Sequence, residues 1–160
     1  MSKLVLYDVE IGEDVQYDLG KFTKEVKKYL DDPNGWKSEG YTFRLVDDRE
    51  KPRFTIILTS PRTLLAHHCK DENLSCAILN GGKVWINAMR WTSGSKASKQ
   101  DLDGYRQYVI SHEVGHALGY DHVDCPGDHE LAPVMMQQTL GIGQCKPNTK
   151  LTPADTKKKQ

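Results

Sequence analysis

The chain has 160 residues, a length that suits one domain able to bury a sizeable core. Its 22 basic and 22 acidic side chains give a formal net charge of zero, which argues against the positive surfaces that bind nucleic acid or membranes. No apolar run is long enough to span a bilayer, and we expect a monomer with neither kind of partner.

The first half of the chain shows patterns typical of strands and of one helix. Residues 3–11, rich in Leu, Val, Tyr and Ile, predict a strand. Asp18 can cap a helix, because apolar residues then recur at helical spacing until a turn at residues 32–35. This apolar face consists of Phe22, Val26, Tyr29 and Leu30. Residues 41–46 and 53–59 predict two further strands, and residues 61–73 a loop or short helix.

The second half begins with a hairpin signal and contains the longest helix. Asn80-Gly81-Gly82 separates two short apolar runs, residues 74–79 and 83–88, as in a two-stranded hairpin. Residues 92–100, rich in Ser, Lys and Gly, predict a loop. Residues 102–118 predict a helix, and little regular pattern follows Gly119.

This order of elements predicts an α+β domain. We expect a mixed, twisted sheet of about five strands, with two helices above a cleft and an irregular part below it. The domain would span residues 1–149, with an upper subdomain at 1–119 and a lower one at 120–149. Residues 150–160 are polar and basic, and we expect them to form a frayed, solvated tail.

Eleven residues carry the strongest functional signal. They read His112-Glu113-Val114-Gly115-His116-Ala117-Leu118-Gly119-Tyr120-Asp121-His122. His112 and His116 are four residues apart, so they project from one face of a helix and can reach one metal ion. Gly119 lets the helix stop and the chain turn, which brings His122 towards the same ion. Three imidazoles leave one position open for water, as in a catalytic zinc site, and Glu113 can take that water's proton.

The alternative is an ordinary helix with two surface histidines, followed by a glycine cap and an unrelated histidine. Capping would explain Gly119, but it would leave three histidines at these spacings to coincidence. In a real metal site, Asp121 or Asp124 can accept the outer N–H of a bound imidazole. His129, near Asp124 and Asp128, could join a calcium or second zinc site, but two carboxylates without a glycine-spaced oxygen loop are a weak signal for one.

The eleven-residue pattern and the order of elements resemble the metzincin clan of zinc metallopeptidases. Within the clan, the chain is similar to a mainly bacterial, metzincin-like domain family of unknown function whose members are often expected to be secreted. The similar pieces lie within residues 30–148 and include Asp32-Pro33-Asn34-Gly35-Trp36, Val84-Trp85-Ile86-Asn87 and Cys125-Pro126-Gly127. The resemblance implies the metzincin fold, one zinc ion held by His112, His116 and His122, and a catalytic Glu113.

The resemblance also implies a tight turn that carries a methionine beneath the metal. Met135 is the expected residue of this Met-turn, where its thioether would form an apolar floor under the imidazoles. Met136 stays open as an alternative, and so does a simple core-filling role for both. Gln137 stands two residues after Met135, where some metzincins have a tyrosine that assists the metal site, so that role cannot be carried over.

Four cysteines bear on the cellular compartment. They allow three disulfide connectivities, and reduced thiols are the expectation for a cytosolic protein. We expect two local pairs, Cys69 with Cys76 and Cys125 with Cys145, because each would close a loop next to the proposed catalytic residues. The first residues lack a secretion signal. The localisation therefore stays open, although paired cysteines and the resemblance favour an oxidising or secreted setting.

These patterns predict a zinc-dependent endopeptidase. A peptide or protein substrate would bind in extended form along an edge strand of the hairpin at residues 74–88. One alternative is a zinc hydrolase of a non-peptide amide, and the other is a zinc-stabilised binding module without turnover. Glu113 argues against the last, because a purely structural site needs no general base.

Overall fold

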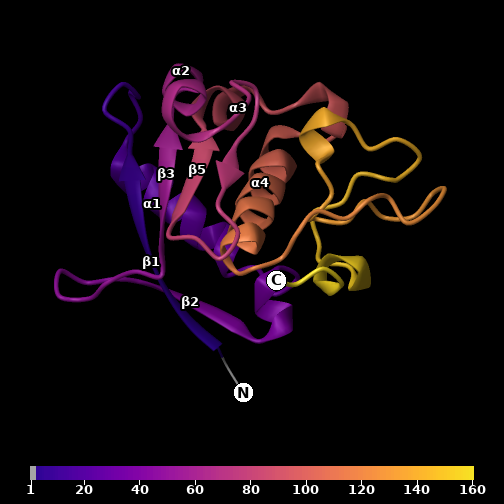
Figure 1. Ribbon diagram of the computed structural model, residues 1–160, viewed down its shortest axis with the longest axis horizontal. Coiled ribbons are helices and arrows are strands. Elements are labelled where there is room, and N and C mark those ends of the chain that lie inside the picture. Colours follow the sequence, from indigo (N-terminus) through magenta and orange to yellow (C-terminus); the bar gives the residue numbers. More distant parts are fainter. Residues whose placement is uncertain (1–2) are drawn as a thin grey trace.

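A five-stranded mixed sheet is the frame of the computed structural model, which describes residues 3–160 apart from the side chain of His67 (Figure 1). The strands are β1 (Lys3–Ile11), β2 (Tyr41–Leu45), β3 (Phe54–Thr59), β4 (Cys76–Ala77) and β5 (Lys83–Asn87), in the order β2-β1-β3-β5-β4. All pairs are parallel except β4 with β5. The predicted mixed sheet is confirmed, and the first two residues of the predicted domain lie outside the described chain.

Alternation and burial explain why these segments form strands. In β1, Val5, Tyr7 and Val9 are buried on one face, whereas the residues between them are only half-buried. The inner strands β3 and β5 are more apolar, and Ile56 of β3 pairs with Val84 of β5 in the fully buried centre of the sheet. The core therefore lies between the sheet and the helices that cover it.

Two long helices occupy the predicted positions. In α1 (Leu19–Leu30), the Asp18 carboxylate accepts a hydrogen bond from the backbone N–H of Lys21, and the expected apolar face is the buried one. In α4 (Leu102–Ala117), the Asp101 carboxylate caps the backbone N–H of Gly104. This helix lies beside β5 (Figure 1), and almost every residue from its second turn onwards is buried. A helix buried on all sides is held by packing, which fixes its side chains in direction.

The structure differs from the prediction between residues 61 and 100. The expected first strand of the hairpin shortens to the two residues of β4, preceded by α2 (Pro61–Thr63) and a single wide turn at Leu64–His68. The predicted loop at 92–100 overlaps α3 (Ala88–Ser93) and a 3-10 turn at Lys96–Ser98. The side chain of Asn87 caps α3 by accepting from the N–H groups of Met89 and Arg90. A helix as short as α3 gives no periodic pattern of apolar residues, so its capping residue Asn87 was the only feature of the sequence that could indicate it.

After α4 the described chain holds 3-10 turns at Gln138–Leu140 and Pro153–Thr156 and isolated β-bridges of Tyr120 with Lys159 and of Leu131 with Lys146, so the lower part has little regular structure, as the sequence predicted. A further 3-10 turn, Trp36–Glu39, follows α1. The division into subdomains at Gly119 stays a prediction.

The expectation of a frayed end was wrong. The backbone N–H of Asp121 donates to the carbonyl of Lys158 at 2.8 Å, and that of Gln160 donates to Gly119 at 2.6 Å. The C-terminus accordingly lies next to the end of α4 (Figure 1). Asp155 is fully buried, whereas Lys157 and its basic neighbours are exposed. The composition of residues 150–160 indicates exposed charges, but it carries no information on the backbone hydrogen bonds that hold this segment in place.

Candidate metal centre

Three histidine side chains from the end of α4 and the loop after it meet at one point. Their ligand nitrogens lie within 4.8 Å of one another, and the Nε2 atoms of His116 and His122 are 3.0 Å apart. Gly119 makes this possible with a φ of +103°, a conformation that side chains rarely adopt. A Cβ at Gly119 would also lie 2.6 Å from Oδ1 of Asn80. The turn that returns His122 to the helix therefore needs a glycine.

Hydrogen bonds fix the tautomer of the two helix histidines. Nδ1 of His112 lies 2.7 Å from the carbonyl oxygen of Val134, and Nδ1 of His116 lies 2.8 Å from that of Tyr120. A carbonyl oxygen can only accept, so each Nδ1 carries the proton and each Nε2 presents a lone pair. This is the arrangement in which histidine binds a metal ion.

The donor set fits zinc. Neutral imidazoles are preferred zinc ligands, and three of them with an open fourth position are typical of catalytic sites. Zinc–nitrogen bonds of about 2.0–2.1 Å at tetrahedral angles place ligand nitrogens about 3.4 Å apart. The separation of 3.0 Å between the Nε2 atoms of His116 and His122 is close to this value.

The outer acceptors differ from those expected. We expected Asp121 or Asp124 to accept the outer N–H of a bound imidazole. For His112 and His116 the acceptors are instead main-chain carbonyls. The carboxylate of Asp121 accepts from the backbone N–H of His122. This hydrogen bond stabilises the conformation of the loop and does not orient an imidazole ring. Sequence proximity suggested the aspartates, but a main-chain acceptor leaves no mark in a sequence.

Burial keeps the histidines neutral. Burial and then His116 lower the pKa of His112 well below its ordinary value, although the bond to Val134 opposes this. Burial and then His122 lower the pKa of His116 to about 4, and burial also lowers the pKa of His122. Burial raises the pKa of Glu113 to about 8. A cation at the three histidines would favour its carboxylate form.

Met135 lies directly beneath the helix that carries the histidines. A Cβ built on Gly115 would collide with the sulfur of Met135 and lie 2.7 Å from Cζ2 of Trp36. Met135 is fully buried, whereas Met136 is half-buried and packs on the separate cluster around Cys145. Of the two methionines, Met135 is therefore the one that packs against the histidine helix, and its assignment to a Met-turn stays a prediction.

A cavity of about 410 Å³ opens in front of the histidines. Its lining includes residues of α4, Gln137 and Thr139, and residues of the loop at 69–77. Glu113 lines the cavity together with the three histidines. The carboxyl group of Glu113 and the three imidazoles thus face one space large enough for part of a peptide.

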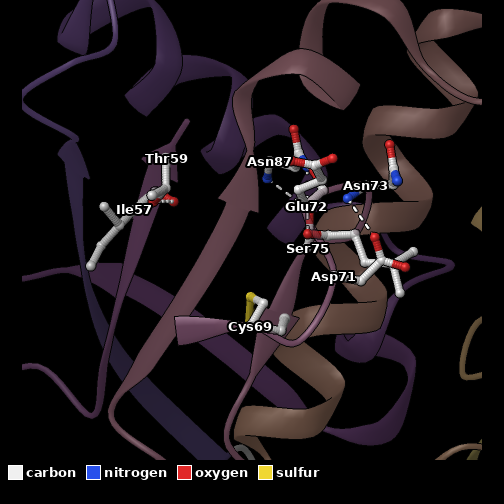
Figure 2. The surroundings of a disulfide bond; sticks show 10 residues. Ile57, Thr59, Cys69, Asp71, Glu72, Asn73, Ser75 and Asn87 are labelled. Atoms are coloured by element: carbon white, nitrogen blue, oxygen red, sulfur yellow. Dashed lines mark hydrogen bonds between the residues drawn. A yellow bond between two sulfur atoms is a disulfide. The ribbon is translucent and has the colours of Figure 1, made fainter. Parts of the chain in front are cut away.

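A disulfide bond and a buried asparagine hold the loop at residues 69–77, which forms a wall of the cavity (Figure 2). Cys69 is bonded to Cys76, with their Cα atoms 6.0 Å apart. Nδ2 of Asn87 donates to the carbonyl of Glu72 at 2.8 Å, and the backbone N–H of Asn87 donates to the hydroxyl of Ser75 at 2.8 Å. The wall is therefore tied to the end of β5.

The second disulfide joins Cys125 to Cys145, with their Cα atoms 5.9 Å apart. Both predicted pairings are confirmed. Two disulfides fit an oxidising or secreted setting. Within residues 3–160, no helix is long and apolar enough to cross a membrane.

Tyr108, one helical turn before His112, has a role in the site that its sequence pattern did not predict. Its hydroxyl donates to the carbonyl of Met136 at 2.8 Å and accepts from the backbone N–H of Gln138 at 2.9 Å. The segment after Met135 is thereby fastened to α4. The spacing of four residues from His112 was the available signal, but it does not distinguish a tyrosine with this role from a core residue.

Comparisons with known proteins give a family and a distant structural similarity. The family described as "Protein of unknown function (DUF3152)" matches residues 2–159. A search of curated proteins finds no match. Among solved structures, the chain is similar to myroilysin with 19% sequence identity and a TM-score of 0.45, over 81% of this chain and 46% of that one. The chain thus spans about half the length of that protein.

Proposed function

The chain belongs to the DUF3152 family of unknown function, and we propose that it is a zinc-dependent endopeptidase. The observation that carries the proposal is the convergence of three imidazoles at one point, with the carboxylate of Glu113 in the same cavity. A purely structural zinc site closes all its positions with protein ligands. Three ligands that face a cavity instead favour a site that works on a bound molecule.

Different residues bind the metal and transfer the proton. His112, His116 and His122 hold the metal. When bound, zinc supplies Lewis-acid polarisation of a carbonyl group and lowers the pKa of water in its open position. Glu113 accepts the proton of the attacking water at its carboxylate and then donates it to the leaving amine nitrogen. Burial of Glu113 shields this carboxylate from bulk water, which strengthens its interaction with a nearby proton donor.

The substrate binds in extended form along β4. This strand is the last in the sheet order of the described chain, and both its residues line the cavity. An extended peptide can add to such an edge through main-chain hydrogen bonds. The disulfide-closed loop before β4 forms the neighbouring wall and so limits which side chains fit. We further propose that the protein acts after secretion, where its two disulfides persist.

A diverse peptide library, incubated with zinc-loaded protein, tests the proposal. We expect cleavage that stops with a zinc chelator and returns on addition of zinc. Turnover of small non-peptide amides without peptide cleavage would favour a different zinc hydrolase. Retention of peptides without cleavage would favour a binding module. Either outcome contradicts the proposed activity.

A further inference from the structure

One peptide group links a metal ligand to a buried carboxylate. The carbonyl oxygen of Val134 accepts from Nδ1 of His112 at 2.7 Å. The N–H of the same peptide group, on Met135, donates to Oδ1 of Asp155 at 2.6 Å. The two bonds lie on opposite ends of one planar amide, so each polarises the group for the other.

Asp155 is built into the protein as an acceptor. It is 0% exposed, and its second oxygen accepts from the backbone N–H of Thr152 at 2.7 Å and from the hydroxyl of Thr152 at 3.1 Å. These partners are all donors, so they suit the carboxylate and not the protonated acid. A carboxylate acceptor forms shorter and stronger hydrogen bonds than a neutral one.

His116, the other helix histidine, is linked through a peptide group in the same way, but to a neutral carbonyl group and not to a carboxylate. The carbonyl of Tyr120 accepts from Nδ1 of His116 at 2.8 Å. The N–H of that peptide group, on Asp121, donates to the carbonyl of Lys158 at 2.8 Å. Both helix histidines are thus backed, through one peptide group each, by the segment at residues 152–160.

We propose that residues 152–160 form the outer support of the metal centre, with Asp155 as a positioning residue that acts on His112 through the Val134–Met135 peptide group. The inference rests on the metal-binding part of the proposed function and not on turnover. In many zinc sites a carboxylate accepts directly from the ligand imidazole, fixes its tautomer and raises its basicity. Here the peptide group passes the effect of the carboxylate to the ring.

The competing explanation is that Asp155 only stabilises its own turn. Its contacts with Thr152 are those of a capping box for the 3-10 turn at Pro153–Thr156. Substitution of Thr152 by valine removes the hydroxyl contact with Asp155 but leaves the oxygen that faces Met135 untouched. Thr152→Val is therefore the matched control for Asp155→Asn, which removes the charge.

The experiment measures the Zn²⁺ affinity of metal-free protein against a chromophoric chelator. Substitution of a direct hydrogen-bond partner of a ligand histidine lowers metal affinity by about 10–100-fold. Asp155 acts through one intervening peptide group, so we expect its substitution to have an effect near the lower limit of this range. We expect Asp155→Asn to weaken Zn²⁺ binding about 10-fold and Thr152→Val less than about 2-fold. Equal affinities in wild type and Asp155→Asn, or equal losses in both variants, would overturn the inference.

Nitrogen-15 NMR of the zinc-loaded protein separates the polarising effect from a loss of stability. In Asp155→Asn, the Nδ1–H resonance of His112 should move upfield, while that of His116 should stay in place as an internal reference.

The wild type alone provides a further test if the variant does not fold. Addition of Zn²⁺ should move the Met135 N–H resonance downfield, because the ring becomes a stronger donor to Val134. A Met135 resonance unaffected by Zn²⁺ would contradict the inference. Zinc binding without peptide cleavage would instead refute only the proposed activity.

Discussion

The sulfur of Met135 packs against Gly115, the residue of α4 that precedes His116 and has no side chain. Trp36 closes the same space from the other side, and its indole N–H donates to the carbonyl of Ser111 at 2.7 Å. The glycine inside the histidine motif is therefore a packing requirement. It lets a buried methionine and a buried tryptophan reach the backbone that positions two of the proposed metal ligands.

This contact predicts the effect of Gly115→Ala. The added Cβ has no room beside Met135 and Trp36, so the variant should lose about 1–3 kcal/mol of stability through overpacking. Urea unfolding measures the loss. Gly20→Ala in α1 is the control, because its Cβ would meet only the Asp18 carboxylate, at 3.3 Å. An unchanged or higher stability for Gly115→Ala would show that Met135 does not constrain the helix.

The two methionines should respond differently to truncation. Met135→Ala should cost about 2–5 kcal/mol and weaken zinc binding, because it leaves a cavity under the histidine helix. Met136→Ala should cost less, since Met136 is half-buried and packs on the Cys125–Cys145 cluster. Thermal unfolding and zinc titration measure both effects. Greater zinc loss from Met136→Ala would overturn the assignment of Met135 to the turn.

His116→Ala should abolish stoichiometric zinc binding. The wild type should carry one zinc per chain, and the variant should also unfold at a lower temperature in the presence of zinc, because metal binding stabilises the folded state. His129→Asn is the control. His129 is exposed with a φ of +62°, which asparagine tolerates. Metal analysis that gives one equivalent for His116→Ala would rule out the proposed ligand set.

Relative to Glu113→Gln, the metal-free protein should lose stability as the pH rises from 6.5 to 8. The pKa of Glu113 is raised to about 8 in the folded state from an ordinary value of 4.5, so in this window Glu113 binds more protons in the folded state than in the unfolded state. The three histidines have lowered pKa values, so in the lower part of this window they bind more protons in the unfolded state, and this opposing gain of stability with pH is common to the wild type and Glu113→Gln. The loss should be about 1–2 kcal/mol, and Glu113→Gln should remove it. Urea unfolding at the two pH values provides the measurement, and equal slopes for both proteins would contradict the buried carboxyl.

The strands, the two long helices and the histidine cluster could be predicted because their signals are local. Phe22, Val26, Tyr29 and Leu30 recur at helical spacing, and the three histidines follow a pattern whose geometry is that of one helix and one turn. Asp155 could not be predicted in its role. Its partner Met135 lies twenty residues away and contributes only a backbone N–H, which every residue other than proline has. The docked C-terminal segment escaped prediction for the same reason.

The most direct test of the central claim is the rate of peptide hydrolysis by zinc-loaded Glu113→Gln. Glutamine keeps the size of the side chain but cannot accept the water proton, so hydrolysis should fall by at least about 100-fold while zinc content stays at one equivalent. Glu130→Gln, at an exposed position of the lower part, should cleave at the wild-type rate. Near wild-type hydrolysis by zinc-loaded Glu113→Gln would contradict the account.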